Sequence, residues 1–380
     1  MIKIINKENC CGCSACVSIC PKKSISMKAD DEGFLYPSVD KNTCVDCGLC
    51  EKVCNSLHPY SKQEPLEVLA AINKNEEVRL NSSSGGIFYL LANKIISKGG
   101  VVFGARFDEN WQVLIDYAED MNSVKAFMGS KYVQARMDTA YNDAKRFLIE
   151  GRMVLFSGTP CQIAGLHKFL RRPYDNLITV DFICHGTPSP LVWKNYLQSS
   201  CIGNKEVSHV NFRSKKNGWK RFCFSINYTD SVSYMAPHPE NLYMKAFLQD
   251  IILRPSCYSC KVKGGSSKSD ITMADFWGIE TIDPKFDDDK GTSMVFINTE
   301  NGHLFFDYDN IQYLRFEYEQ VKDLNIAYHS SALVHPRRKK FFRSLRNEEE
   351  LLPLLKKCTR PTFRQKLWKI EDLIFSFFKR

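Results

Sequence analysis

The sequence predicts an α+β fold in three parts: a cysteine-rich N-terminal domain over residues 1–60, a mixed α/β body over 61–335, and a helical, basic tail over 336–380. Three observations lead to this prediction. Two evenly spaced cysteine runs lie before residue 55. Apolar stretches of strand type and of helix type alternate through the middle of the chain, as in mixed α/β domains. Residues 337–380 hold 14 Lys or Arg against 5 Asp or Glu, which equals the whole net charge of +9.

The composition is that of a globular protein, since 44% of the 380 residues are hydrophobic and 25% are charged. No run of 18 apolar residues is present, so we expect no bilayer-spanning helix. The first residues lack the apolar segment of an export signal, and we therefore expect a cytoplasmic protein with reduced thiols. Clustered cysteines in that compartment bind metals or carry out redox chemistry. The balanced charge outside the tail argues against a nucleic-acid-binding body.

The N-terminal domain carries two copies of C-x2-C-x2-C-x3-C, 34 residues apart. This run is typical of a bacterial-type ferredoxin with two [4Fe-4S] clusters, because each loop supplies three thiolates and its fourth cysteine reaches the other cluster. The expected ligand sets are Cys10, Cys13, Cys16 and Cys54 for one cluster, and Cys20, Cys44, Cys47 and Cys50 for the other. Structural zinc is the alternative, but zinc sites favour paired C-x2-C motifs. Cys11 stands outside the pattern, and we expect it to be a bystander.

The body begins with a strand, a Ser/Gly loop at residues 82–86, and a helix. Phe88, Leu91 and Ile95 have near-helical spacing and predict that helix. The free N–H groups at its start would favour an anion such as a phosphate. A Ser-rich loop with glycine is more commonly only a helix cap, so both interpretations stand.

Cys161 follows an apolar strand and a turn at Gly158. Thr159 is the expected N-cap of the next helix, with Pro160 at the first helical position. A thiol in the first turn of a helix is favoured as a thiolate by the helix dipole. That position suits a metal ligand and a nucleophile equally.

Three more cysteines accompany Cys161 in the body. Cys184 ends an apolar strand, at the edge of an open sheet where ligands bind, and Cys257 and Cys260 form a C-x2-C pair. The four sulfurs are consistent with a structural zinc site, with buried or disulfide-cycling thiols, or with a third [4Fe-4S] cluster. The iron–sulfur character of the N-terminal domain favours the third interpretation.

Six motifs in order along residues 1–300 resemble the family of the coenzyme F420 hydrogenase/dehydrogenase β-subunit, and more narrowly its bacterial branch with a fused two-cluster ferredoxin. The motifs are SSSGGIFYLL, GSKYVQ, LFSGTPCQIAGL, VDFICHGTPSP, RPSCYSC and DITMADFWGI. The family includes 7-hydroxymethyl chlorophyll a reductase. One departure from the family pattern is Ala274, where its motif has glycine.

The resemblance implies that the body binds FAD and an additional [4Fe-4S] cluster. It implies that the ligands of this cluster are Cys161, Cys184, Cys257 and Cys260. It also implies flavin contacts from the Ser/Gly loop, the GSKY segment, the turn before Cys161 and the DITMADFWGI strand, namely Ser84, Gly85, Gly86, Lys131, Gly158, Thr159 and Asp275.

A flavin beside iron–sulfur clusters converts two-electron into one-electron transfer. We therefore predict an iron–sulfur flavoprotein oxidoreductase that passes electrons between its clusters, FAD and an unidentified small substrate. A role in polysaccharide biosynthesis follows only by association. The alternative is an adaptor with no substrate of its own that feeds a partner enzyme. The expected protein partner is a ferredoxin or a partner oxidoreductase, and no GxGxxG after a strand supports a nicotinamide site.

Weaker candidates complete the prediction. Lys131 could stabilise a reduced flavin and His185 could donate a proton, whereas a solvated lysine and a structural histidine are the alternatives. The basic, aromatic stretch 212–222 suits an acidic substrate or a solvated hairpin. The tail segment 363–380 predicts a basic amphipathic helix that contacts the inner membrane surface, the body or a partner. Three cysteines lack ligand spacing and are expected to be bystanders: Cys201, Cys223 and Cys358.

Overall fold

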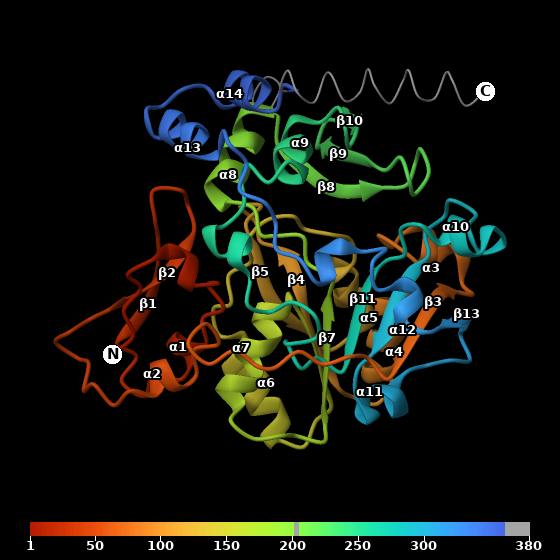
Figure 1. Ribbon diagram of the computed structural model, residues 1–380, viewed down its shortest axis with the longest axis horizontal. Helices are drawn as coiled ribbons and strands as arrows, with labels where there is room; N and C mark the ends of the chain where they lie inside the picture. The colour runs from red at the N-terminus through yellow and green to blue at the C-terminus, as the bar shows by residue number, and fades with distance from the viewer. Residues whose placement is uncertain (201–204, 362–380) are drawn as a thin grey trace.

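An eight-stranded mixed sheet forms the centre of this computed structural model, which describes residues 1–200 and 205–361 (Figure 1). The strand order is β13-β3-β12-β11-β7-β6-β4-β5. The middle strands β11, β7, β6 and β4 run parallel, and the outer strands pair antiparallel. The strands are β3 (Glu67–Asn73), β4 (Val101–Phe107), β5 (Val113–Ala118), β6 (Val154–Ser157), β7 (Leu177–Phe182), β11 (Ile271–Asp275), β12 (Ser293–Ile297) and β13 (Ile311–Phe316).

Helices cover both faces of this sheet. One face packs on α4 (Ile87–Ile96), through side chains such as Leu91 and Val102. The opposite face packs on α6 (Ala140–Ile149) and α7 (Pro160–Leu170), through side chains such as Phe103 and Phe156. Successive residues of a strand point to opposite faces of the sheet. Because helices cover both faces, both sets of side chains are buried, which explains the continuous apolar runs in the sequence.

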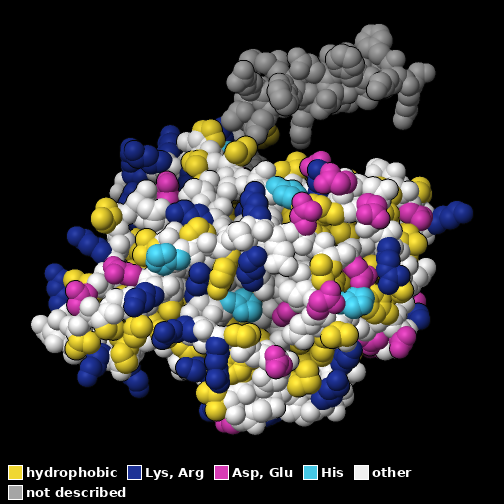
Figure 2. Space-filling model, turned by 60° about the horizontal axis from the view of Figure 1, so that its bottom comes forward, with side chains coloured by type: hydrophobic (Ala, Val, Ile, Leu, Met, Phe, Trp, Pro, Cys, Tyr) yellow, Lys and Arg dark blue, Asp and Glu magenta, His cyan; other side chains and the backbone are white. Residues whose placement is uncertain are grey.

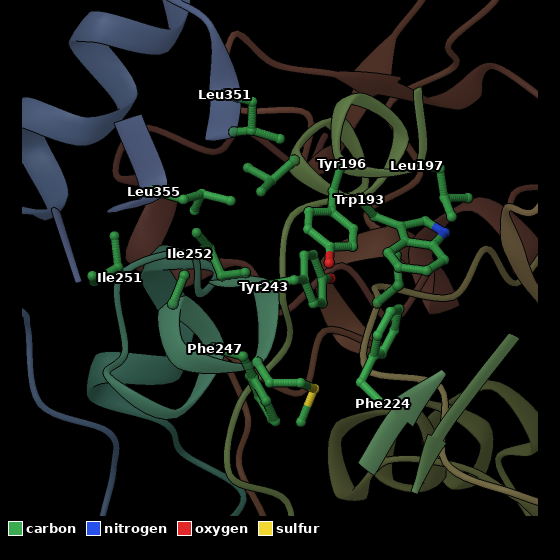
Figure 3. Close-up of a cluster of buried hydrophobic side chains, with 14 of the residues drawn as sticks. Trp193, Tyr196, Leu197, Phe224, Tyr243, Phe247, Ile251, Ile252, Leu351 and Leu355 are labelled. Carbon is green, nitrogen blue, oxygen red and sulfur yellow. The ribbon is translucent and has the colours of Figure 1, made fainter. Parts of the chain in front are cut away.

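A second layer lies beside the sheet (Figure 1). It holds the three-stranded sheet β10-β9-β8 and helices whose aromatic and aliphatic side chains converge (Figure 3). Trp193, Tyr243 and Leu355 are among the side chains at its centre. Its elements are α8 (Pro190–Ser200), β8 (Val207–Ser214), β9 (Cys223–Tyr228), β10 (Ser233–Pro237), α9 (Leu242–Leu248), α13 (Arg338–Arg346) and α14 (Leu351–Cys358).

The N-terminal domain is built from short elements. They are η1 (Lys7–Asn9), α1 (Ala15–Ser18), the hairpin β1 (Ile25–Ala29) and β2 (Leu35–Val39), and α2 (Leu49–Lys52). The hairpin turn docks on the second layer, where Phe34 is fully buried. The carboxylate of Glu32 accepts two hydrogen bonds from Arg338.

The first part of the basic segment forms the helices α13 and α14. Its apolar side chains, including Phe341 and Leu355, pack into the second layer, while Arg338 and Arg346 pair with acidic residues of the N-terminal hairpin. The amphipathic helix expected over 363–380 lies outside the described residues. Across residues 1–200 and 205–361, no helix has the length and apolar character needed to cross a membrane.

Short elements complete the body. They are α3 (Glu76–Leu80), α5 (Met121–Val124), η2 (Lys125–Phe127), η4 (Pro255–Ser259), α10 (Ile279–Ile282), η5 (Pro284–Phe286), α11 (Glu300–Phe305), α12 (Tyr318–Val321) and η6 (Ile326–Tyr328).

Candidate functional site

A large cavity of about 740 Å³ opens at the carboxyl ends of β6, β7 and β11. In open α/β sheets this edge is where ligands bind, and the volume is in the range of cofactor and substrate pockets. Its walls include six of the seven residues expected around a flavin: Ser84, Gly86, Lys131, Gly158, Thr159 and Asp275.

The turn between β6 and α7 has the conformation that its sequence favours. Thr159 is the N-cap of α7 and Pro160 is its first residue. The backbone N–H and the hydroxyl of Thr159 both donate to Gln162 Oε1, at 2.9 and 3.0 Å. The thiol of Cys161 therefore lies in the first helical turn, 3.2 Å from Thr159 Oγ1.

Gly85, the seventh expected flavin contact, does not line the large cavity. Its N–H donates to Ser293 Oγ at 2.9 Å, and its carbonyl accepts from Asn73 N at 2.8 Å. A Cβ at this position would lie 2.3 Å from the Ala71 carbonyl oxygen. Glycine is thus required for the Ser/Gly loop to approach the backbone of β3, and Gly86 with φ +83° caps α4.

Lys131 is half-buried and hydrogen-bonded. Its ammonium donates hydrogen bonds to the carbonyls of Ala126, Met128 and Gly129, at 2.8, 2.8 and 3.1 Å. Burial lowers the pKa of Lys131 to about 7. The side chain therefore fastens residues 126–131 into one wall of the large cavity.

Asp275 is paired with a residue that sequence reasoning did not single out. Its two carboxylate oxygens accept from Arg213 at 2.7 and 3.1 Å, and one accepts from Trp219 Nε1 at 2.9 Å. Arg213 is only 6% exposed, and its guanidinium lies over the rings of Phe222 and Trp277. The stretch 212–222 is therefore part of the cavity wall rather than a solvated hairpin, and its mixed basic and aromatic composition was the available signal.

The four cysteines of the body, called here the body set, come together. Cys161, Cys184, Cys257 and Cys260 all line a smaller cavity. Two of them, Cys161 and Cys184, also line the large cavity. Burial raises the pKa of Cys184 to about 12 and also raises those of Cys257 and Cys260. The pKa of Cys161 is raised by a hydrogen bond with Cys11 and by burial. Such thiols differ from the low-pKa cysteines that act as nucleophiles.

Two buried cations accompany the body set. Lys263 is 9% exposed and donates to the carbonyls of Cys184 and Ala327, at 2.6 and 2.7 Å. Arg254 is 1% exposed and has only neutral hydrogen-bond partners. Within the described ranges, neither cation has a carboxylate at ion-pair distance. Because an unpaired buried charge is costly, this environment fits an anionic group such as a thiolate-held cluster.

The ferredoxin cysteines also gather as the spacing predicts. The outer set lines one small cavity, with Cys47 exposed: Cys20, Cys44, Cys47 and Cys50. In the inner set (Cys10, Cys13, Cys16 and Cys54), burial raises the pKa of Cys16, and the charges of Cys10 and Cys54 raise it further. Among the described residues, no group of three or more His, Cys, Asp or Glu is arranged around a single metal ion. The four cysteines of a [4Fe-4S] site surround a whole cluster and therefore need not converge on one metal ion.

Cys11 lies between the inner set and the body set, which its sequence position did not indicate. Cys13 and Cys161 both lower the pKa of its thiol, and Cys11 lines both body cavities. Gly165 shows how close the two regions lie, since a Cβ there would meet Cys13 Sγ at 3.0 Å. The inner set is therefore packed directly on α7, the helix that carries Cys161.

The remaining candidates have structural surroundings. His185 Nε2 lies 2.7 Å from Asp250 Oδ1, and the ring packs edge-on against Phe247, although His185 also lines both body cavities. Cys223 and Cys358 are buried in the second layer, and Cys201 lies outside the described residues.

Comparison with known proteins agrees with the resemblance seen in the sequence. Residues 151–323 match the family model for the C-terminal part of the coenzyme F420 hydrogenase/dehydrogenase beta chain, and residues 9–56 match the 4Fe-4S dicluster domain. One component of the F(420)H(2) dehydrogenase of Methanosarcina mazei is 25% identical over 172 residues, which cover 42% of this chain and 48% of the relative. One component of the H(2):CoB-CoM heterodisulfide, ferredoxin reductase of Methanothermobacter marburgensis is 29% identical over 79 residues, covering 17% and 12%.

The matched segments span about half of the first relative and a smaller part of the second. Among solved structures, a chain of the F420-reducing [NiFe] hydrogenase complex from Methanosarcina barkeri is similar with a TM-score of 0.48 and 17% identity. That similarity covers 78% of this chain and 91% of the other.

Proposed function

Since this chain belongs to the family of the coenzyme F420 hydrogenase/dehydrogenase β-subunit through residues 151–323 and carries a 4Fe-4S dicluster domain over residues 9–56, we propose that it relays electrons between its ferredoxin surface and a flavin in the large cavity. Residues 1–60 are the ferredoxin domain and 61–335 the flavin-binding body, followed by the tail over 336–380. The protein is an oxidoreductase, and its substrate binds in the same cavity as the flavin.

One observation carries the proposal. The three cysteine sets follow one another from the surface to the large cavity. Cys47 of the outer set is exposed, Cys11 contacts both the inner set and the body set, and Cys161 and Cys184 of the body set line the large cavity. A chain of one-electron carriers needs this kind of succession, because electrons pass singly from cluster to cluster.

The body set is proposed to hold a third [4Fe-4S] cluster. Four thiols, from the start of α7, the segment after β7 and one C-x2-C pair, surround a cavity. The buried Lys263 lines this cavity, and the buried Arg254 precedes Cys257 by three residues. Iron would displace the protons that the raised pKa values keep on these thiols. Four thiolates and a cubane form an anion, whose charge the two cations would offset.

The flavin is proposed to occupy the large cavity, where it would exchange two electrons with a substrate and single electrons with the clusters. Gly158 and Thr159 line the cavity at the start of α7, and Lys131 fixes the conformation of residues 126–131, of which 127–131 also line it. The Nε of Arg213 is buried and has no hydrogen-bond acceptor among the described residues. We expect it to donate to a bound ligand.

An enzyme with its own substrate is favoured over an adaptor by the aromatic wall of the cavity. Trp277 stacks on Trp219 with ring centroids 4.4 Å apart and lines the cavity. Phe222 stacks in the same way on His238, at 4.2 Å. Arg213 lies over Phe222 and Trp277, at 4.1 and 5.4 Å. Flat apolar faces beside a buried cation would seat a planar organic molecule next to the flavin.

The test is the content of iron, acid-labile sulfide and flavin in the full chain, purified without oxygen. We expect about twelve irons and one FAD per chain. Cys184→Ser should lower the iron to about eight, whereas the control Cys223→Ser, at a cysteine buried in the second layer, should leave it unchanged. About eight irons in the wild-type chain would contradict the third cluster, and the absence of flavin would contradict the assignment of the large cavity.

A further inference from the structure

Arg254 stands at the junction between the N-terminal domain and the body. Its Nε donates to the carbonyl of Cys10 at 2.8 Å, and its Nη2 donates to the carbonyl of Leu35 at 2.9 Å. Its Nη1 donates to Gln134 Oε1 at 3.2 Å. The guanidinium lies 4.1 Å from the ring centre of Tyr36. All of these partners are neutral.

Among the buried arginines of the described residues, burial without a counter-charge distinguishes Arg254. Two other buried arginines, Arg79 and Arg213, are each 6% exposed and pair with the carboxylates of Asp288 and Asp275. Arg254 is 1% exposed and, within residues 1–200 and 205–361, has no such partner. An arginine stays protonated in proteins, so the charge has to be compensated by something else nearby.

Segments that carry expected cluster ligands adjoin Arg254 both in space and along the chain. In space, a Cβ at Gly12 would lie 3.0 Å from its Cζ and Nη1, so the guanidinium touches the loop that carries Cys10 and Cys13. Along the chain, Cys257 of the body set follows Arg254 by three residues, and its backbone N–H donates to the Arg254 carbonyl at 2.9 Å. The same cation lowers the pKa values of Cys10 and Cys257 against the effect of burial. It is therefore close to both the inner set and the body set.

We propose that Arg254 is the shared counter-ion of two iron–sulfur clusters, one held by the inner set and one by the body set, and that it raises both reduction potentials. This inference rests on the proposed function. A cluster held by four thiolates is an anion that gains one negative charge when it accepts an electron, so a buried cation beside it favours the reduced form. In the step itself one electron leaves the first cluster and enters the second. No bond changes, and Arg254 keeps its protons.

Lys263 provides a matched control. It is a buried cation without a carboxylate partner in the described parts of the chain, and it adjoins the body set alone through the carbonyl of Cys184. Lys263→Met should therefore lower one reduction potential, whereas Arg254→Met should lower two. Arg254→Lys keeps the charge while losing the forked hydrogen bonds, and it should keep both potentials near those of the wild type.

The experiment is a redox titration of the loaded full chain, with the reduced clusters followed by electron paramagnetic resonance and iron counted in each sample. Arg254→Met should weaken reduction of the inner and body clusters about tenfold, which corresponds to about 59 mV for one electron. The cluster of the outer set should be unaffected. Unchanged potentials in an Arg254→Met chain that retains its iron would overturn the proposal.

If Arg254→Met loses iron, Arg254→Lys carries the test. Potentials near the wild-type values then support the counter-ion, and a tenfold weaker reduction of both clusters contradicts it. Failure of the proposed function is distinguishable, because about eight irons in the wild-type chain would remove the body cluster itself. About twelve irons with unmoved potentials would overturn only the role of Arg254.

Discussion

The outer set and the body set each consist of four cysteines, but their surroundings differ. The outer set comes from two short runs beside four-residue helices, and Cys47 is exposed. The body set comes from three segments within residues 161–260 and lies beside the buried Lys263 and the large cavity. Exposure suits exchange of electrons with another protein, whereas burial beside a cavity suits exchange with a cofactor. We therefore expect the surroundings, and not the ligands, to give the two sites different roles.

The largest expected difference concerns folding. Residues 1–60 have two five-residue strands and a small core around Ile2, Ile25 and two cluster cysteines, whereas the body contains a central sheet of eight strands. Structural metal sites contribute on the order of 10 kcal/mol to folding. Removal of iron should therefore abolish protection from hydrogen exchange in β1 and β2 and preserve it in β6 and β7. Equal protection in both regions after iron removal would break the contrast.

Thiol reactivity should separate the two sets next. In the iron-free chain, Cys47 is exposed, and burial raises the pKa of Cys184 to about 12. Relative to an ordinary thiol, that shift lowers the thiolate fraction at pH 7.5 roughly a thousandfold. Alkylation followed by peptide mass spectrometry should label Cys47 in minutes and Cys184 far more slowly. Similar rates would mean that the body set is open to solvent.

The buried interior of the body should also respond to pH. Asp181 on β7 is 2% exposed, and burial raises its pKa to about 6. The folded chain takes up this proton near pH 6 and the unfolded chain near pH 4, so this contribution to stability is present below pH 4 and is lost as the pH rises through 6. The loss amounts to about 3 kcal/mol.

Asp181→Asn should therefore raise the midpoint of thermal unfolding above pH 7, by an amount that corresponds to about 1–3 kcal/mol. The matched control is Asp175→Asn, because Asp175 is exposed just before the same strand. An unchanged or lower midpoint for Asp181→Asn at high pH would mean that the carboxylate is stabilised in the folded protein.

The smallest expected effect concerns the exposed outer set and its docking with a protein partner. Dark-blue Lys and Arg side chains are spread over the left-hand lobe in Figure 2, where Figure 1 places the N-terminal domain. Lys22 lines the cavity of the outer set, and Lys23 is exposed beside it. Replacing both with glutamate should slow cluster reduction by an acidic ferredoxin severalfold at low ionic strength, and the effect should vanish in high salt.

The control is Lys98→Glu, at an exposed lysine after α4 on the body. It should leave the rate of reduction unchanged at every salt concentration. An equal effect of both charge reversals would place the docking surface elsewhere.

The two sites also differ in how well the sequence predicted them. Spacing alone gave the outer and inner sets, because their loops are local and each fourth cysteine follows at a fixed distance. Local rules likewise predicted the start of α7 at Pro160. The body set could be assembled from the sequence only as four sulfurs with three open interpretations, and the family resemblance implied a cluster, since no spacing rule connects Cys161, Cys184 and Cys257 across three segments.

What the sequence did not predict depends on contacts between distant segments. Cys11 was expected to be idle and instead contacts the inner set and the body set, which required knowing that the ferredoxin loop packs on α7. Nothing in the sequence distinguishes Arg254 from other basic residues. Its hydrogen-bond partners, Cys10 and Leu35, lie more than 200 positions away in the chain. Lys131 was considered as a flavin contact or a solvated lysine, but its three carbonyl partners arise from a loop conformation that composition does not reveal.

The most direct test of the relay is reduction of the bound flavin by a protein too large to enter the cavity. A pre-reduced small ferredoxin is mixed rapidly with the loaded full chain, and flavin absorbance is followed in the wild type and in Cys260→Ser chains that retain flavin. We expect rapid bleaching in the wild type and bleaching at the background rate in Cys260→Ser. Equal rates in the two chains would contradict the relay, because electrons would then reach the flavin without passing through the body set.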